Sequence, residues 1–124
     1  MRVLLVDKRV LFLEGLKKVF HSNNIEVAGT ALSNSDALEK TRELDPDLIV
    51  IDVTGAGQER LNTIRQIKAE NGAIKIIVLA DSKENLAAAE QNKACGCLLN
   101  SIVGEDLLAM INELGKELKE RECI

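Results

Sequence analysis

Short apolar runs alternate with longer segments of helical spacing along the whole chain, and this alternation constrains the fold more than any other feature. Most of the runs are rich in Val, Ile and Leu, which is typical of strands buried on both faces of a parallel sheet. In the run at 25–31, the positions of Ile25, Val27 and Gly29 alternate with those of Glu26, Ala28 and Thr30, which predicts an edge strand with one wetter face. The expected strands are Val3–Val6, Ile25–Ala31, Leu48–Ile51, Ile76–Ala80 and Cys97–Leu99.

Between these runs, apolar residues recur at intervals of three and four, which predicts amphipathic helices. In the first helix we expect Val10 and Leu13 to lie off the stripe that faces the sheet, and Gly15 to permit a close approach. That predicted stripe consists of Phe12, Gly15, Leu16, Val19 and Phe20. Four further helices are expected, around residues 37–44, 61–67, 82–89 and 103–118. Strict alternation of strands and helices implies right-handed crossovers and a doubly wound parallel α/β sheet.

Composition limits the class of protein further. A chain of 124 residues without Trp or Tyr and with two Phe fits one domain, residues 1–124, with an aliphatic core. We expect 115–124 to be a charged helix end or the start of a linker. A net charge of −4 without a basic run argues against direct binding of nucleic acid. No apolar stretch is long enough to span a bilayer, so we expect a cytoplasmic protein that does not contact membranes.

Two carboxylates follow neighbouring strands of the predicted sheet. Asp7 comes directly after the first run and Asp52 directly after the third. Because ligands of open α/β sheets bind at the carboxyl ends of the strands, we expect Asp7 and Asp52 to share one site. The alternative is that they only cap loops or pair with Lys8. Ala80 ends the fourth run and Asp81 follows it, and Asn100 and Ser101 follow the fifth, so we expect these residues at the same edge.

At these positions the chain resembles the response-regulator receiver domains of two-component signalling, which have the CheY-like fold. The segment RVLLVDKRVLFLEGL is similar to the family's first strand and helix, above all in the NarL/LuxR-type subfamily with a DNA-binding output domain. The segments DPDLIVIDV, IKIIVLADS and ACGCLLNS resemble its third, fourth and fifth strands. The resemblance covers residues 1 to about 115 and implies a flavodoxin-like, three-layer fold with strand order 2-1-3-4-5.

The resemblance implies that a histidine kinase transfers a phosphoryl group to Asp52, with Mg²⁺ held by Asp7 and Asp52. Several positions depart from the family's pattern. Lys8 stands where the family has a second acidic residue, Ala80 replaces a Thr or Ser, Asn100 replaces a Lys and Cys97 replaces an aromatic side chain. Each change removes a metal ligand, a group that stabilises the phosphoryl oxygens, or a part of the family's signalling switch, in which the aromatic side chain changes rotamer together with the hydroxyl of the fourth strand.

We therefore expect an atypical, non-enzymatic receiver that acts through protein contacts, without phosphorylation and without a cofactor. In this hypothesis the Lys8 ammonium lies between Asp7 and Asp52 and replaces Mg²⁺. The expected partners of the protein are a histidine kinase or an output domain, and only the output domain would contact DNA. A second copy of the chain could also bind, through the face formed by the fourth helix, fifth strand and fifth helix. The alternative is a working phosphoacceptor, which would require Mg²⁺.

Other chemistry is less well supported by the sequence. The segment Gly55-Ala56-Gly57 is similar to half of a phosphate-binding loop, but Arg60 interrupts the motif and it follows the wrong strand. A flexible loop is the simpler interpretation, and an anion at the amino end of the third helix near Arg60 is the alternative. A flavodoxin-like ligand domain would need a phosphate loop after the first strand and aromatic residues to stack on a flavin. Cys95 and Cys97 lack the spacing of a zinc site, so free thiols are expected, and His21 suits a surface role.

Overall fold

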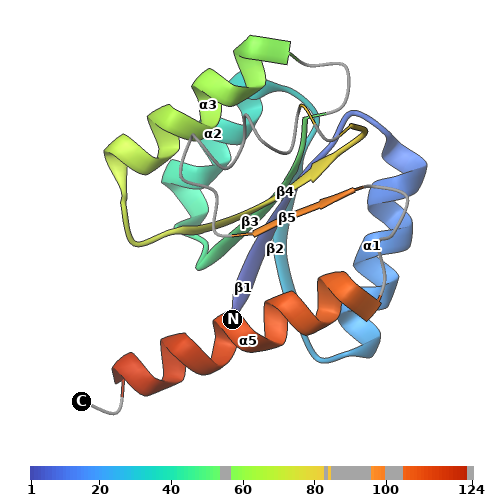
Figure 1. Ribbon diagram of the computed structural model, residues 1–124, viewed down its shortest axis with the longest axis vertical. Coiled ribbons are helices and arrows are strands. Elements are labelled where there is room, and N and C mark those ends of the chain that lie inside the picture. Colours follow the sequence, from blue (N-terminus) through green and yellow to red (C-terminus); the bar gives the residue numbers. More distant parts are fainter. Residues whose placement is uncertain (54–56, 83, 85–95, 100–104, 123–124) are drawn as a thin grey trace.

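Five parallel strands form one sheet in the order β2-β1-β3-β4-β5, in the middle of the computed structural model (Figure 1). This confirms the predicted doubly wound sheet, its strand order and the edge position of the second strand. The structure describes residues 1–53, 57–82, 84, 96–99 and 105–122. The strands are β1 (Arg2–Val6), β2 (Glu26–Ala31), β3 (Leu48–Asp52), β4 (Lys75–Ala80) and β5 (Gly96–Leu99).

Helices cover both faces of the sheet and complete the three layers (Figure 1). They are α1 (Val10–Ser22), α2 (Asn34–Leu44), α3 (Gly57–Glu70) and α5 (Glu105–Glu122). The core has two parts, because the side chains of each strand alternate between the faces. One part packs under α2 and α3, and the other under α1 and α5. Within the described ranges, no helix combines the length and apolar character needed to cross a bilayer. The helix expected near 82–89 lies outside the described residues.

The core-facing stripe of α1 differs from the predicted one. Leu13 is buried, whereas Val19 is exposed, and a side chain at Gly15 would meet open space rather than the sheet. The actual stripe is Leu13, Leu16 and Phe20, with Phe12 half-buried beside it. Residues 10–13 are all apolar, so the start of the helix does not fix its rotation about its own axis. The prediction of Gly15 as a point of close approach was therefore wrong.

The register of the sheet brings the ends of β1 and β3 together. Val6 pairs with Ile51 of β3 and with Ala31 of β2, so Asp7 leaves β1 beside the last residue of β3. Asp52 lies opposite Leu79 of β4. The apolar residues of β1 and β3 are buried throughout, which holds the two strand ends rigidly at this edge.

Candidate functional site

The side chains of Asp7 and Asp52 lie together at the carboxyl edge of the sheet and are almost completely buried, each with 4% of its surface exposed. The backbone N–H of Asp7 donates to the carbonyl of Ala31 at 3.1 Å, and that of Val53 donates to Leu79 at 2.9 Å. Both chain segments are thereby fixed beyond the ends of their strands. A buried carboxylate is costly unless a cation or hydrogen-bond donors compensate its charge, so the partners of this pair define the site.

The guanidinium of Arg9 bridges the two carboxylates. Its Nη2 lies 2.8 Å from Oδ2 of Asp7 and 2.8 Å from Oδ2 of Asp52, and its Nε lies 3.1 Å from Oδ1 of Asp7. Arg9 thus makes a two-pronged contact with Asp7 and a single contact with Asp52. The hydrogen bond to Asp7 is the main cause that raises the pKa of Arg9 above its ordinary value. The guanidinium also stacks on the ring of Phe12, 4.0 Å from its centroid, which helps to hold its position.

The predicted position of Lys8 was wrong, since Lys8 is exposed and Arg9 occupies the place between the carboxylates. The reason is a local turn. Oδ1 of Asp7 accepts the backbone N–H of Arg9 at 2.8 Å, an aspartate-centred turn that brings the second following residue back onto the carboxylate. Lys8 is thereby left pointing into solvent. The sequence carried a signal for this, because an Asp side chain readily accepts the backbone N–H of the second following residue, here Arg9.

A second arginine, Arg60 in the first turn of α3, lies at the same edge. The residue is 5% exposed, and its Nε and Nη1 atoms are buried without a hydrogen-bond partner among the described residues. Burial lowers the pKa of Arg60, while the charges of Asp52 and Asp7 oppose that effect. In the sequence, Arg60 stood out as an interruption of a loop motif and as a residue near the amino end of a helix, where an anion could bind. Its spacing from Asp52 gave no indication that it would be buried.

The fold implies a Mg²⁺ ion at this edge, so the side chains present here can be compared with the ligands that Mg²⁺ requires. Mg²⁺ requires octahedral oxygen coordination and is usually held by one or two carboxylates together with several waters. Here Arg9 donates to both carboxylates, Lys8 offers no oxygen, and Arg60 adds a second positive charge. Within the described part of the chain, no group of three or more His, Cys, Asp or Glu side chains is arranged to hold a metal ion. The residues present therefore fit a guanidinium better than a divalent metal.

The remaining predicted positions are placed as follows. Ala80 is the last residue of β4 and is buried. Its methyl side chain offers no hydroxyl at this edge. Cys97 lies on β5 and is half-buried. His21 is exposed in the last turn of α1. Asn100, Ser101, Cys95, Cys123 and the segment 54–56 lie outside the described residues.

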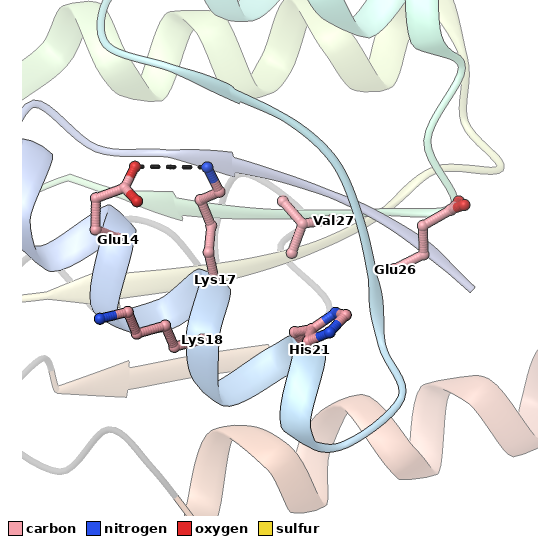
Figure 2. Close-up of a pocket in the computed structure, with 6 residues that line it drawn as sticks. All are labelled: Glu14, Lys17, Lys18, His21, Glu26 and Val27. Carbon is pink, nitrogen blue, oxygen red and sulfur yellow. Dashed lines mark hydrogen bonds and ion pairs between the residues drawn. The ribbon is translucent and has the colours of Figure 1, made fainter.

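A separate shallow pocket lies along α1 and β2, away from the buried carboxylates (Figure 2). It encloses about 420 Å³ and is lined by Glu14, Lys17, Lys18, His21, Glu26 and Val27. Lys17 pairs with Glu14 across one turn of the helix at 3.5 Å, as the dashed line in Figure 2 marks. Its charged groups are of both signs and exposed, so this pocket lacks the buried, convergent polar groups of a chemical site.

Parallel strands in the order 2-1-3-4-5 with a carboxylate pair at their carboxyl ends define a receiver-like α/β signalling domain. Comparison with known proteins agrees, because the response regulator receiver domain family model matches residues 3–112. The chain therefore belongs to the response regulator receiver domain family.

Individual relatives support the same family assignment. The nitrate/nitrite response regulator NarL of Escherichia coli is 29% identical over 114 residues, which are 90% of this chain and 53% of that protein. The chemotaxis protein CheY of Thermotoga maritima is 32% identical over 93 residues, which are 75% of this chain and 78% of that protein. A receiver domain structure from Clostridium thermocellum superimposes with a TM-score of 0.85 at 22% identity, and covers 95% of this chain and 96% of that one. The chain spans about half the length of the first curated relatives that it matches.

Proposed function

We propose that this receiver domain signals through protein contacts without Mg²⁺ and without phosphorylation of Asp52. The observation that supports the proposal most directly is the ion pair of Arg9 with both carboxylates. In a phosphorylatable receiver these oxygens hold the metal, and one of them attacks the phosphorus. Here the guanidinium takes both roles away, because it neutralises the carboxylates and covers the oxygens with hydrogen bonds.

The sequence positions that would support phosphoryl transfer agree with this proposal. Ala80 has no hydroxyl to donate to a phosphoryl oxygen, and Asn100 is neutral where the family has an ammonium. Phosphoryl transfer depends almost entirely on positioning and on stabilisation of charge. Removing a metal ligand, a hydroxyl and a cation together therefore lowers the rate far more than any one loss.

We propose that the partners are proteins: an output domain in the same polypeptide, a kinase, or a second copy of this chain. The names of relatives such as NarL describe response regulators, and those proteins are about twice as long as this chain. Contact with DNA would then belong to an output domain. For a second copy, the proposed face consists of β5, α5 and the segment between β4 and β5. A dilution series by light scattering in which the protein stays monomeric would exclude the dimer.

The alternative function, phosphoacceptance by Asp52, is kept because that carboxylate ends β3 at the expected place. Incubation with a small phosphodonor and Mg²⁺, followed by intact mass measurement, separates the two. We expect no adduct on the wild-type chain. A stoichiometric phosphoryl adduct that is lost in Asp52→Asn would overturn the proposal and establish the alternative.

A further inference from the structure

We propose that the carboxyl edge of the sheet beside Arg60 binds a small tetrahedral oxyanion, of the inorganic phosphate class, without a covalent bond to the protein. The inference rests on the proposed function, because it takes Arg9 and not a divalent metal as the cation that holds Asp7 and Asp52. It adds a ligand to that site and a role for a residue that the proposed function does not use.

The first support is the state of the Arg60 side chain. A guanidinium has five N–H donors and no acceptor, and in Arg60 the Nε and Nη1 groups are buried with no acceptor among the described residues. Leaving charged donors unpaired in the interior is costly. A tetrahedral oxyanion offers several acceptor oxygens in one small group and matches the fork of a guanidinium with two parallel hydrogen bonds.

The second support is the balance of charge at the edge. The buried carboxylates Asp7 and Asp52 carry two negative charges, and Arg9 and Arg60 carry two positive ones, so the charges of these four groups sum to zero. Asp81, which follows β4 at the same edge, is exposed. Moreover, Arg9 already binds both carboxylates, at 2.8 Å each. Nε and Nη1 of Arg60 donate to neither Asp52 nor Asp7, although the charges of both carboxylates act on this guanidinium, so these two groups are the donors that a ligand would use. Lys8, exposed next to Arg9, adds a further positive charge nearby.

The third support is the position of Arg60 in α3. It belongs to the first turn of a helix of 14 residues. The first backbone N–H groups of a helix have no partner within it, and the helix dipole is positive at this end, so both favour an anion. The acidic side chain of the same turn, Glu59, is exposed and so lies outside the buried cluster. The arginine and the helix end therefore favour the same ligand charge.

The test is titration of the whole chain with inorganic phosphate at constant ionic strength and without Mg²⁺, followed by calorimetry. We expect saturable binding to the wild-type protein. Arg60→Met should weaken it by about tenfold or more, because a charged hydrogen-bond donor is lost. Arg65→Met is the matched control, since Arg65 is exposed on the same helix, and it should bind phosphate like the wild type. Arg60→Lys, which keeps the charge and loses the fork, should be intermediate and serves if Arg60→Met does not fold.

Three results would overturn the inference: no saturable binding to the wild type, equal weakening by Arg60→Met and Arg65→Met, or equally tight binding of acetate, which is not tetrahedral. Intact mass after the titration separates this inference from the proposed function. An unchanged mass with no phosphate binding contradicts the oxyanion site alone. A phosphoryl adduct formed with a phosphodonor and Mg²⁺ contradicts the proposed function.

Discussion

Two arginine–carboxylate pairs in this molecule have nearly the same geometry and very different surroundings. On the outer surface, Arg42 of α2 contacts Glu70 of α3 through Nη2 at 2.6 Å and Nε at 3.2 Å. At the sheet edge, Arg9 contacts Asp7 through the same two nitrogens at 2.8 and 3.1 Å. The Glu70 side chain is 40% exposed, whereas that of Asp7 is 4% exposed.

The two pairs differ in the burial of the carboxylates and in the number of carboxylates that one guanidinium contacts, and not in hydrogen-bond geometry. Water can replace either partner of the exposed pair, so the pair mainly links two helices and contributes little stability. At the sheet edge, water cannot replace Arg9, because two buried carboxylates depend on the same guanidinium. Loss of the arginine would remove the ion pair that both carboxylates share. The following predictions test this contrast, from the largest expected effect to the smallest.

Removal of each arginine is the most direct comparison. Arg9→Ala should lower the free energy of unfolding by about 2–3 kcal/mol, below the range for a fully buried pair because the Arg9 side chain is 41% exposed. Arg42→Ala should change it little. Denaturant unfolding of the two variants provides the measurement. Equal losses would contradict the contrast between the pairs.

Metal binding can be engineered if Arg9 is what prevents it. In the double variant Lys8→Asp, Arg9→Ala, the guanidinium that covers Asp7 and Asp52 is gone, and an acidic residue next to Asp7 adds negative charge. Mg²⁺ at ten times its dissociation constant should then stabilise the fold by about 1.4 kcal/mol. Lys8→Asp alone is the control and should gain much less, because Arg9 still covers the oxygens. Equal gains in the two variants would assign the blocking role to Lys8 instead.

Arg60 tests whether a cation at this edge stabilises the fold when its donors are unpaired. Because burial of Arg60 opposes its charged form, Arg60→Met should leave the free energy of unfolding unchanged or raise it by up to about 1 kcal/mol. Thermal and denaturant unfolding without added phosphate measure the effect. A loss comparable to that of Arg9→Ala would mean that Arg60 is a required partner of the carboxylates.

The exposed pair of Arg42 and Glu70 should have the smallest effect on the free energy of unfolding, and that effect should depend on pH. The hydrogen bond from Arg42 lowers the pKa of Glu70 below its ordinary value of 4.5. A lowered pKa in the folded state means that the contribution to stability is complete above the ordinary pKa and is lost as the pH falls through the lowered one. The small difference between wild type and Glu70→Gln should therefore shrink below pH 4.5. Arg42→Gln should remove the same dependence, and a difference that stays constant down to full protonation would contradict the coupling.

Most of the fold could be predicted from the sequence, because each strand is a local apolar run and strict alternation with helices permits few topologies. The strand ends followed from the same pattern, so Asp7 and Asp52 could be placed at one edge. The rotation of α1 could not be predicted, since its start is apolar at every position. Only the packed helix shows that Leu13, and not Gly15, faces the sheet.

The cations of the site were harder to predict, because their positions depend on contacts that leave little trace in the sequence. Lys8 occupies the position of the family's second acidic residue, but the turn around Asp7 brings Arg9 to the carboxylates instead. Arg60 is buried through the packing of α3 on the sheet, which residue spacing does not reveal. A cation of the chain was therefore correctly expected between the carboxylates, but it is Arg9 and not Lys8.

The central claim is that a guanidinium of the chain itself takes the place of Mg²⁺. The most direct measurement is titration of the unmodified wild-type protein with MgCl₂ at constant ionic strength, followed by its chemical unfolding midpoint, with CsCl as the control for ionic strength. The account predicts the same midpoint in both salts at millimolar concentrations. A saturable increase specific to Mg²⁺, abolished in Asp52→Asn, would show that the metal displaces Arg9 and would contradict it.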